Sequence, residues 1–204
     1  MAPQMYAPAI SRMLNAEIDW DTDTIKGMLV TSSYTPDFTA HDYKNDVTNE
    51  VVGTGYTAGG ATLASKTVTT TAANSWATSR ANSTAYTLGA VVRPATGNGF
   101  LYQAVVAGTS GASIPTYPTV IGQTVTDGGV TWACVGRNIL QFDAADLSWA
   151  SSTITARGIV IYKDTGTAYT SPLIMADMNA SDQSSSSGTF TAPFDALGVF
   201  YAFV

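Results

Sequence analysis

The sequence predicts an all-β protein, a β-sandwich of jelly-roll or Greek-key type that is interrupted by a small all-β module. No segment longer than about one helical turn shows an apolar period near 3.6 residues, the signature of an amphipathic helix. Short runs rich in Val, Ile, Thr and aromatic residues are instead separated by turns rich in Gly, Asn and Asp, as strands are. An immunoglobulin-like sandwich is the alternative, although its Cys–Trp–Cys pattern is absent.

The chain divides into an arm, a discontinuous sandwich and an insert. With 204 residues it is long enough for one domain that carries a small module. Residues 1–16 predict an extended N-terminal arm, because their first nine residues hold two prolines and show no period. Residues 17–75 and 138–204 predict the sandwich. Residues 76–137 predict the module, where apolar runs alternate with Gly-rich turns about every ten residues.

The first half of the sandwich contains three expected strands. Thr24–Ser32 is apolar and β-prone, Glu50–Val52 is strand-like, and Lys66–Thr71 is rich in β-branched residues. Between the first two, Ser32–Asn49 predicts a loop with one helical turn near Ala40–Asn45. In the module, Asp127-Gly128 predicts a hairpin between two short strands.

The second half of the sandwich is built on a long strand at Ile154–Tyr162, after the chain re-enters at Asn138–Phe142. Its run Gly158–Tyr162 is apolar at every position, which predicts a central strand that is buried on both faces. After it we expect a strand at Pro172–Met178, a flexible polar loop at Ala180–Gly188 and an apolar final strand at Gly198–Val204.

The charge pattern narrows the classes of partner. The chain has 9 Lys and Arg against 15 Asp and Glu, and the basic residues are scattered, so no nucleic acid is expected. No run approaches about 18 apolar residues, so no membrane span is expected. No secretory h-region is present, which indicates assembly inside a cell. A surface with so few charges is covered by a neighbour without desolvating many ions.

No cofactor, metal site or catalytic residue is predicted. Cys134 is the only cysteine, so neither an internal disulfide nor a thiolate cluster is expected. Asp19, Asp21 and Asp23 are spaced like the start of a calcium loop, but the sixth position is not Gly and the twelfth is not Glu, so turn caps are favoured. His41, the only histidine, lies in a loop with no nucleophile in its pattern, and no hydrolase or phosphate-loop motif occurs.

Four side chains are candidate contacts to a partner or a glycan. Tyr117 and Trp132 lie in the module, where aromatic rings either form its small core or stack on sugar rings. Met5 and Tyr6 are apolar residues of the arm, which suggests that the arm docks on a neighbouring chain.

Three segments of the sandwich resemble a family of small structural proteins of tailed bacteriophages. They read EIDWDTDTIKGMLVTSSYTPDFTAHDY, GTGYTAGGATLASKTVT and FDAADLSWASSTITARGIVIYKDTG, and the resemblance covers most of residues 17–71 and 139–195. It implies a virion component comparable to head decoration (cement) proteins, several of which are jelly-roll-like oligomers on the capsid lattice.

The module resembles modules of phage tail and fibre proteins and is similar to small chitin- and cellulose-binding modules. Those share an A-Y-x-x-G-x-x-V…Y-x-A pattern, which is matched here by Ala85, Tyr86, Gly89, Val92, Tyr102 and Ala104. The paired aromatic residues that grip chitin would follow Ala104, where this chain reads VVAGTSG. That departure puts polysaccharide binding in doubt.

The expected function is that of a non-enzymatic capsid decoration protein. It would bind the major capsid protein as a homotrimer on the outer surface of the virion, after assembly in the host cytoplasm. The alternatives are a tail or fibre component that adsorbs to host glycans through the module, and an enzyme that acts on such glycans.

Overall fold

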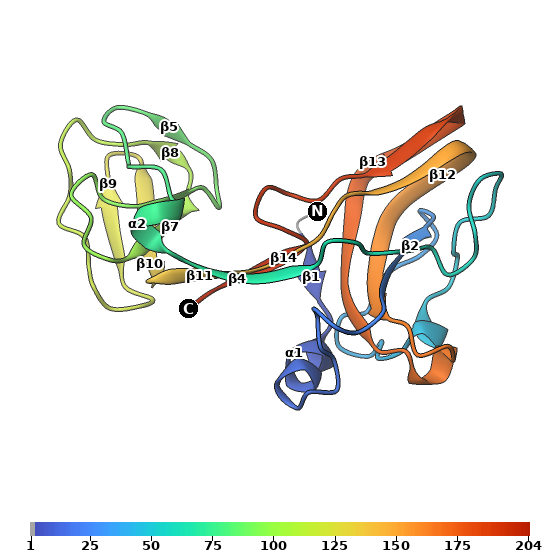
Figure 1. The fold of residues 1–204 in the computed structure, drawn as a ribbon. Coiled ribbons are helices and arrows are strands. Elements are labelled where there is room, and N and C mark those ends of the chain that lie inside the picture. The colour runs from blue at the N-terminus through green and yellow to red at the C-terminus, as the bar shows by residue number, and fades with distance from the viewer. Residues whose placement is uncertain (1–2) are drawn as a thin grey trace. The chain divides into compact units, whose positions relative to one another are not determined.

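Strands dominate the computed structural model, which describes residues 3–204 apart from the side chains of residues 74 and 76 (Figure 1). The strands form several sheets, and the pairings within them are antiparallel, so the predicted all-β, sandwich-like class is confirmed. Within residues 3–204, no helix has the length and apolar character needed to cross a membrane.

The chain forms two compact units. The sandwich unit contains Met1–Val68 and Phe142–Phe200, and the insert unit contains Thr69–Gln141 and Tyr201–Val204. The insert unit is thus wider than the predicted 76–137, and the last four residues group with it rather than with the sandwich. The unit boundaries fall within three strands that pair in the order β14-β11-β4, namely β4 (Thr67–Ala72), β11 (Asn138–Asp143) and β14 (Phe200–Phe203).

A five-stranded sheet organises the sandwich unit, with the order β1-β13-β12-β2-β3. Its strands are β1 (Gln4–Met5), β2 (Ile25–Val30), β3 (Ala61–Thr62), β12 (Leu147–Lys163) and β13 (Leu173–Ala192). β12 lies in the centre, as its doubly apolar run predicted. Ile159 and Ile161 enter one buried cluster, and Val160 and Tyr162 enter a second cluster on the other face.

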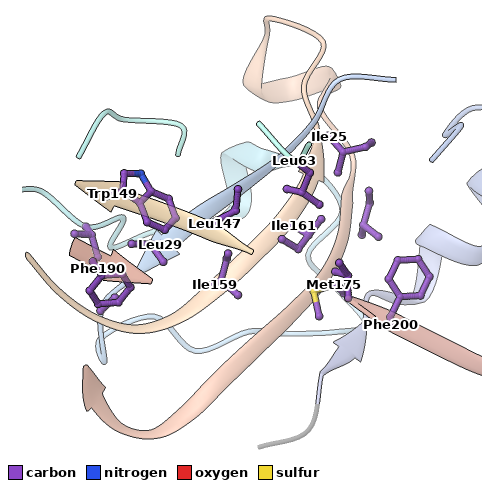
Figure 2. Close-up of a cluster of buried hydrophobic side chains, with 14 of the residues drawn as sticks. Ile25, Leu29, Leu63, Leu147, Trp149, Ile159, Ile161, Met175, Phe190 and Phe200 are labelled. Carbon is purple, nitrogen blue, oxygen red and sulfur yellow. The ribbon is translucent and has the colours of Figure 1, made fainter. Parts of the chain in front are cut away.

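The hairpin of β12 and β13 supplies much of both layers. In its inner arms, which are the halves of β12 and β13 next to the connecting turn, Ile161 pairs with Met175. In its outer arms, which are the halves far from that turn, Trp149 pairs with Phe190. The register shifts between the arms, at bulges from Trp149 to Gly158, and bulges bend strands. Trp149, Phe190 and Ile161 share one cluster, so the outer arm lies over one face of the inner arm (Figure 2).

The predicted extended arm, residues 1–16, is helical over Ala7–Leu14, which corrects that part of the prediction; residues 1–2 lie outside the described residues. Ala7–Leu14 forms helix α1, with Pro8 in its first turn, where a missing backbone N–H costs no hydrogen bond. Ala9 is fully buried, and Met13, four residues on, packs against the core of the sandwich unit. One apolar i, i+4 pair does not establish a helical period, so the sequence pattern did not predict this helix.

The polar stretch Ala180–Gly188 is not a loop, which corrects a second prediction. It belongs to β13 and is held by β12 through side chains as well as backbone. The hydroxyls of Ser152 and Ser185 lie 2.7 Å apart, and those of Thr155 and Ser184 lie 2.8 Å apart. Composition alone predicted flexibility, whereas cross-strand pairing holds Gln183, Ser184, Ser185 and Gly188, and Asn179–Asp182 bulge opposite Arg157.

The remaining turns follow the predictions more closely. The loop after β2 contains one short 3₁₀ turn, η1 (Lys44–Asp46), next to the expected position, and a second turn, η2 (Ala168–Thr170), lies between β12 and β13. Asp46 accepts hydrogen bonds from the backbone N–H groups of Asp42 and Tyr43, which fixes the start of η1.

The insert unit holds a four-stranded sheet in the order β6-β7-β10-β9 and a two-stranded sheet of β5 and β8. The predicted hairpin is confirmed as β9 and β10, with Val130 opposite Asp127. The elements are α2 (Ala73–Trp76), β5 (Ala85–Tyr86), β6 (Val91–Val92), β7 (Leu101–Val106), β8 (Gly108–Thr109), β9 (Thr124–Asp127) and β10 (Val130–Gly136).

We predict that Gly60→Ala strongly destabilises the sandwich unit. Gly60 has φ +74°, and a Cβ there would overlap the carbonyl oxygen of Gly27 in β2. Gly166 is a matched control with φ +84° and no atom within 4 Å of its would-be Cβ. Gly166→Ala should cost about 1 kcal/mol from backbone strain alone. Gly60→Ala should cost at least about 2 kcal/mol more in urea unfolding; equal costs would contradict the close packing.

We also predict that the sandwich unit folds without most of the insert. The ends of the insert already meet, because the backbone N–H of Ala73 donates to the carbonyl oxygen of Arg137 at 2.9 Å. Replacing residues 73–137 by a two-residue Asn-Gly turn should therefore close β4 onto β11. The shortened chain should unfold cooperatively and retain a β-type circular dichroism spectrum. A product without a cooperative transition would show that the two units share one core.

Candidate functional site

The two candidate aromatic residues of the insert lie in its core. Trp132 is 0 % exposed, and the edge of the Tyr86 ring packs against it with centroids 4.9 Å apart. Tyr117 is half-buried, with its ring 4.3 Å from that of Tyr102. A fully buried indole offers no face to a sugar, so the structure places Trp132 in the core rather than on a contact surface.

A buried ion pair lies beside Trp132. The guanidinium of Arg80 donates to both carboxylate oxygens of Asp127, from Nε at 2.8 Å and from Nη2 at 2.6 Å. Both side chains are almost completely buried. Arg80 also donates to the carbonyl oxygen of Gly111, while Asp127 accepts from the Trp132 indole N–H at 2.9 Å and from the Gly111 N–H at 2.9 Å.

This network is a structural centre of the insert unit. Burial alone would raise the pKa of Asp127, but hydrogen bonds from Arg80, Trp132 and Gly111 outweigh it and hold that pKa below its usual value. The network fastens the segment after β8 to the β9–β10 hairpin. The hydrogen bonds of the buried pair go to other groups of the insert unit, so the pair stabilises the fold of that unit. The Tyr117 hydroxyl nearby is buried with no hydrogen-bond partner in the described part of the chain.

Met5 and Tyr6 are also internal to the sandwich unit. Tyr6 is 0 % exposed, and its hydroxyl lies 2.8 Å from that of Tyr34, which in turn lies 3.0 Å from Nδ1 of His41. Burial raises the pKa of Tyr6 well above its usual range. Met5 is half-buried and pairs with Met175. Tyr6 therefore packs into the core of its own sandwich unit. Its side chain is not exposed for the expected docking on a neighbouring chain.

The aspartates near Trp20 serve as turn caps. Asp19 accepts hydrogen bonds from the backbone N–H groups of Asp21 and Thr22, which lower its pKa. Asp23 accepts from the N–H of Asp19 and forms an ion pair with Lys163 at 2.8 Å. Among residues 3–204, no group of three or more metal-ligating side chains is placed to hold an ion.

A cavity of about 400 Å³ in the sandwich unit lies between the arms of the β12–β13 hairpin. One wall comes from the inner arm, including Ile159 and Asp177, and the other comes from Thr189–Pro193 of the outer arm. The lining combines apolar side chains with amides and hydroxyls, a mixture typical of small-ligand sites. It consists of Leu29, Ala156, Gly158, Ile159, Asp177, Asn179, Gln183, Ser184, Thr189, Phe190, Thr191, Ala192 and Pro193.

Asp177 is the one charged residue in this lining. It lies directly opposite Ile159 in the β-ladder and is half-buried. Burial raises the pKa of its carboxyl, and a hydrogen bond from the Met178 N–H offsets only part of that rise. Neither Lys nor Arg lines the cavity, so this carboxylate carries a charge that the surrounding side chains do not neutralise.

Sequence reasoning missed Asp177, although a signal was present. The residue is an acid inside an otherwise apolar strand, Leu173–Met178. A charged side chain in such a run is costly to bury and marks either a surface position or a site. Arg80 offered no such signal, because it lies in a small polar stretch that gives no hint of burial.

The outer edge of β13 is the second feature of note in the sandwich unit. Beyond its pairing with β1 at Met175 and Ala176, this edge meets no other strand in residues 3–204. Asn179–Ser184 is exposed at every position and carries one charge, Asp182. Strands with free edges are templates for pairing with another chain.

Comparisons of the chain with protein-family models, with curated proteins and with solved structures found no match.

We predict that Arg80→Ala destabilises the insert unit by about 3–5 kcal/mol, because it leaves the Asp127 charge buried and uncompensated. Arg157→Ala is the matched control: Arg157 pairs with Asp182 at 2.7 Å, but both side chains are substantially exposed. That change should cost no more than about 1 kcal/mol. Urea unfolding followed by Trp fluorescence measures both. Similar losses for the two variants would contradict the structural role of the buried pair.

Proposed function

We propose that this protein is a structural component of a phage virion that decorates the outer surface of the capsid. Its partner would be the major capsid protein, and it would act without catalysis or a cofactor. The resemblance of residues 17–71 and 139–195 to small structural proteins of tailed phages supports the class. The free edge of β13 supports the mode of action and is the observation that carries the proposal.

The chemistry of the β13 edge suits burial in an assembly. Its exposed stretch is built from Ser, Asn and Gln side chains with the single charge of Asp182. Covering such a surface desolvates hydroxyls and amides that find new hydrogen-bond partners, whereas covering a charged edge would desolvate ions. A strand of a neighbour that adds to this edge gains main-chain hydrogen bonds as well.

Symmetry would multiply a modest contact. In this proposal the chain forms a trimer at three-fold positions of the capsid lattice, so that each contact is made three times per assembly. Linked contacts of this kind raise the apparent affinity without any new type of interaction.

Cryo-electron microscopy of particles from the source culture tests the proposal. We expect density for the sandwich unit at repeated positions over the capsid shell. Particles from which the protein has been removed should regain that density when the purified chain is added. Density confined to the tail, or to no part of the particle, would contradict the proposal.

A charge variant tests the role of the β13 edge. Ser181→Lys adds a cation to this edge, where Lys blocks strand addition, and should lower the occupancy of the capsid at least about tenfold. Asn45→Lys adds the same charge to the exposed η1 turn of the sandwich unit and should leave the occupancy unchanged. Equal occupancies for the two variants would exclude the β13 edge as the contact.

A further inference from the structure

We propose that the Asp177 cavity binds an alkylammonium or guanidinium group, the cation that a Lys or Arg side chain presents. This inference goes beyond the proposed function, because it concerns a ligand site in the sandwich unit. One part of it rests on the proposed function: in an assembled particle, the cation would come from a basic side chain of a capsid neighbour.

The charge of the cavity selects for a cation. Asp177 supplies one negative charge, and the other twelve lining residues are uncharged. Its partial burial weakens the screening by water that an exposed carboxylate enjoys. An entering cation would be attracted to the carboxylate more strongly than to an exposed acid such as Asp182, which already pairs with Arg157.

The polar lining matches the donors of such a cation. An ammonium has three N–H donors and a guanidinium has five, with no acceptor on either. Asn179 and Gln183 also line the cavity, and the side chain of each carries an acceptor oxygen. A cation in this position would replace its hydration by several oxygen partners, as charge-assisted hydrogen bonds require.

The apolar part of the lining matches the stem of the same side chain. Leu29, Ile159 and Phe190 line the cavity, and Pro193 adds an apolar ring from the outer arm. Methylene groups of Lys and Arg pack on surfaces of this kind while the charged head seeks polar partners. The volume of about 400 Å³ is ample for one such side chain.

The cavity also lies beside the free edge of β13. Asn179, Gln183 and Ser184 belong both to its lining and to the exposed stretch of that strand. A partner segment that pairs with the edge would bring its side chains close to Asp177. Backbone pairing with specificity from side-chain pockets is a known mode of strand addition.

Titration of the full chain with n-butylammonium chloride tests the proposal, followed by amide chemical shifts in NMR. Salt at about 0.15 M screens exposed carboxylates. We expect saturable shifts at Asp177, Asn179 and Gln183. n-Butanol and glucose, which lack the charge, should bind at least about tenfold more weakly.

Two variants and one control locate the site. Asp177→Asn should weaken butylammonium binding at least about tenfold, whereas Asp182→Asn, on the same strand, should leave it unchanged. Thr189→Trp adds bulk to the opposite wall and should also weaken binding, without touching the carboxylate. Unchanged binding in Asp177→Asn, or equal binding of butanol or glucose, would overturn the proposal, the latter in favour of a neutral polyol.

A short peptide distinguishes the sources of the cation. Acetyl-Thr-Lys-Thr-amide should bind more tightly than butylammonium if the cation comes from a partner strand that pairs with β13. Equal affinity would assign the cavity to a free amine. The capsid result is independent of this test, since decoration through the β13 edge does not require an occupied cavity.

Discussion

The pairing of β12 with β13 is the interaction on which the rest of the sandwich unit depends. Inner-arm residues of β12 fill buried clusters on both faces of the sheet, and the outer arms return over one of those faces. A hairpin that forms part of both layers needs bulges, because an unbroken antiparallel ladder does not turn back on itself. Ser151 and Ser187 adopt positive φ values at this bend, so the turn is made with small polar residues rather than with glycine.

The same hairpin carries the cavity and the open edge on which the two proposals rest. Where the arms diverge, side chains no longer fill the space between them, and the cavity beside Asp177 remains. Where β13 extends beyond the two residues of β1, its outer edge has no strand to pair with in the described part of the chain.

The hydrophobic pattern of the sequence predicted the elements whose side chains are buried. It failed for segments whose conformation is set by pairing with another strand. The run Gly158–Tyr162 revealed a central strand because apolar side chains on successive positions require two buried faces. Ala180–Gly188 was interpreted as a loop because Ser side chains carry no pattern, and only the partner strand makes them extended. The role of Trp132 depended on Arg80 and Asp127, which are 47 residues apart and meet only in the fold. A residue such as Asp177 was within reach of sequence reasoning, since its neighbours in the strand are apolar.

The carboxylates of Asp127 and Asp177 differ in how well hydrogen bonds compensate for their loss of water. Asp127 receives four hydrogen bonds, two from Arg80 and one each from Trp132 and Gly111, and its pKa falls despite burial. Asp177 is less buried, yet its pKa rises, because the donors around it do not match the loss of water. A satisfied carboxylate has nothing left to offer a ligand. A carboxylate with too few hydrogen-bond donors is stabilised by a donor from a bound group, and the cavity beside Asp177 has room for such a group.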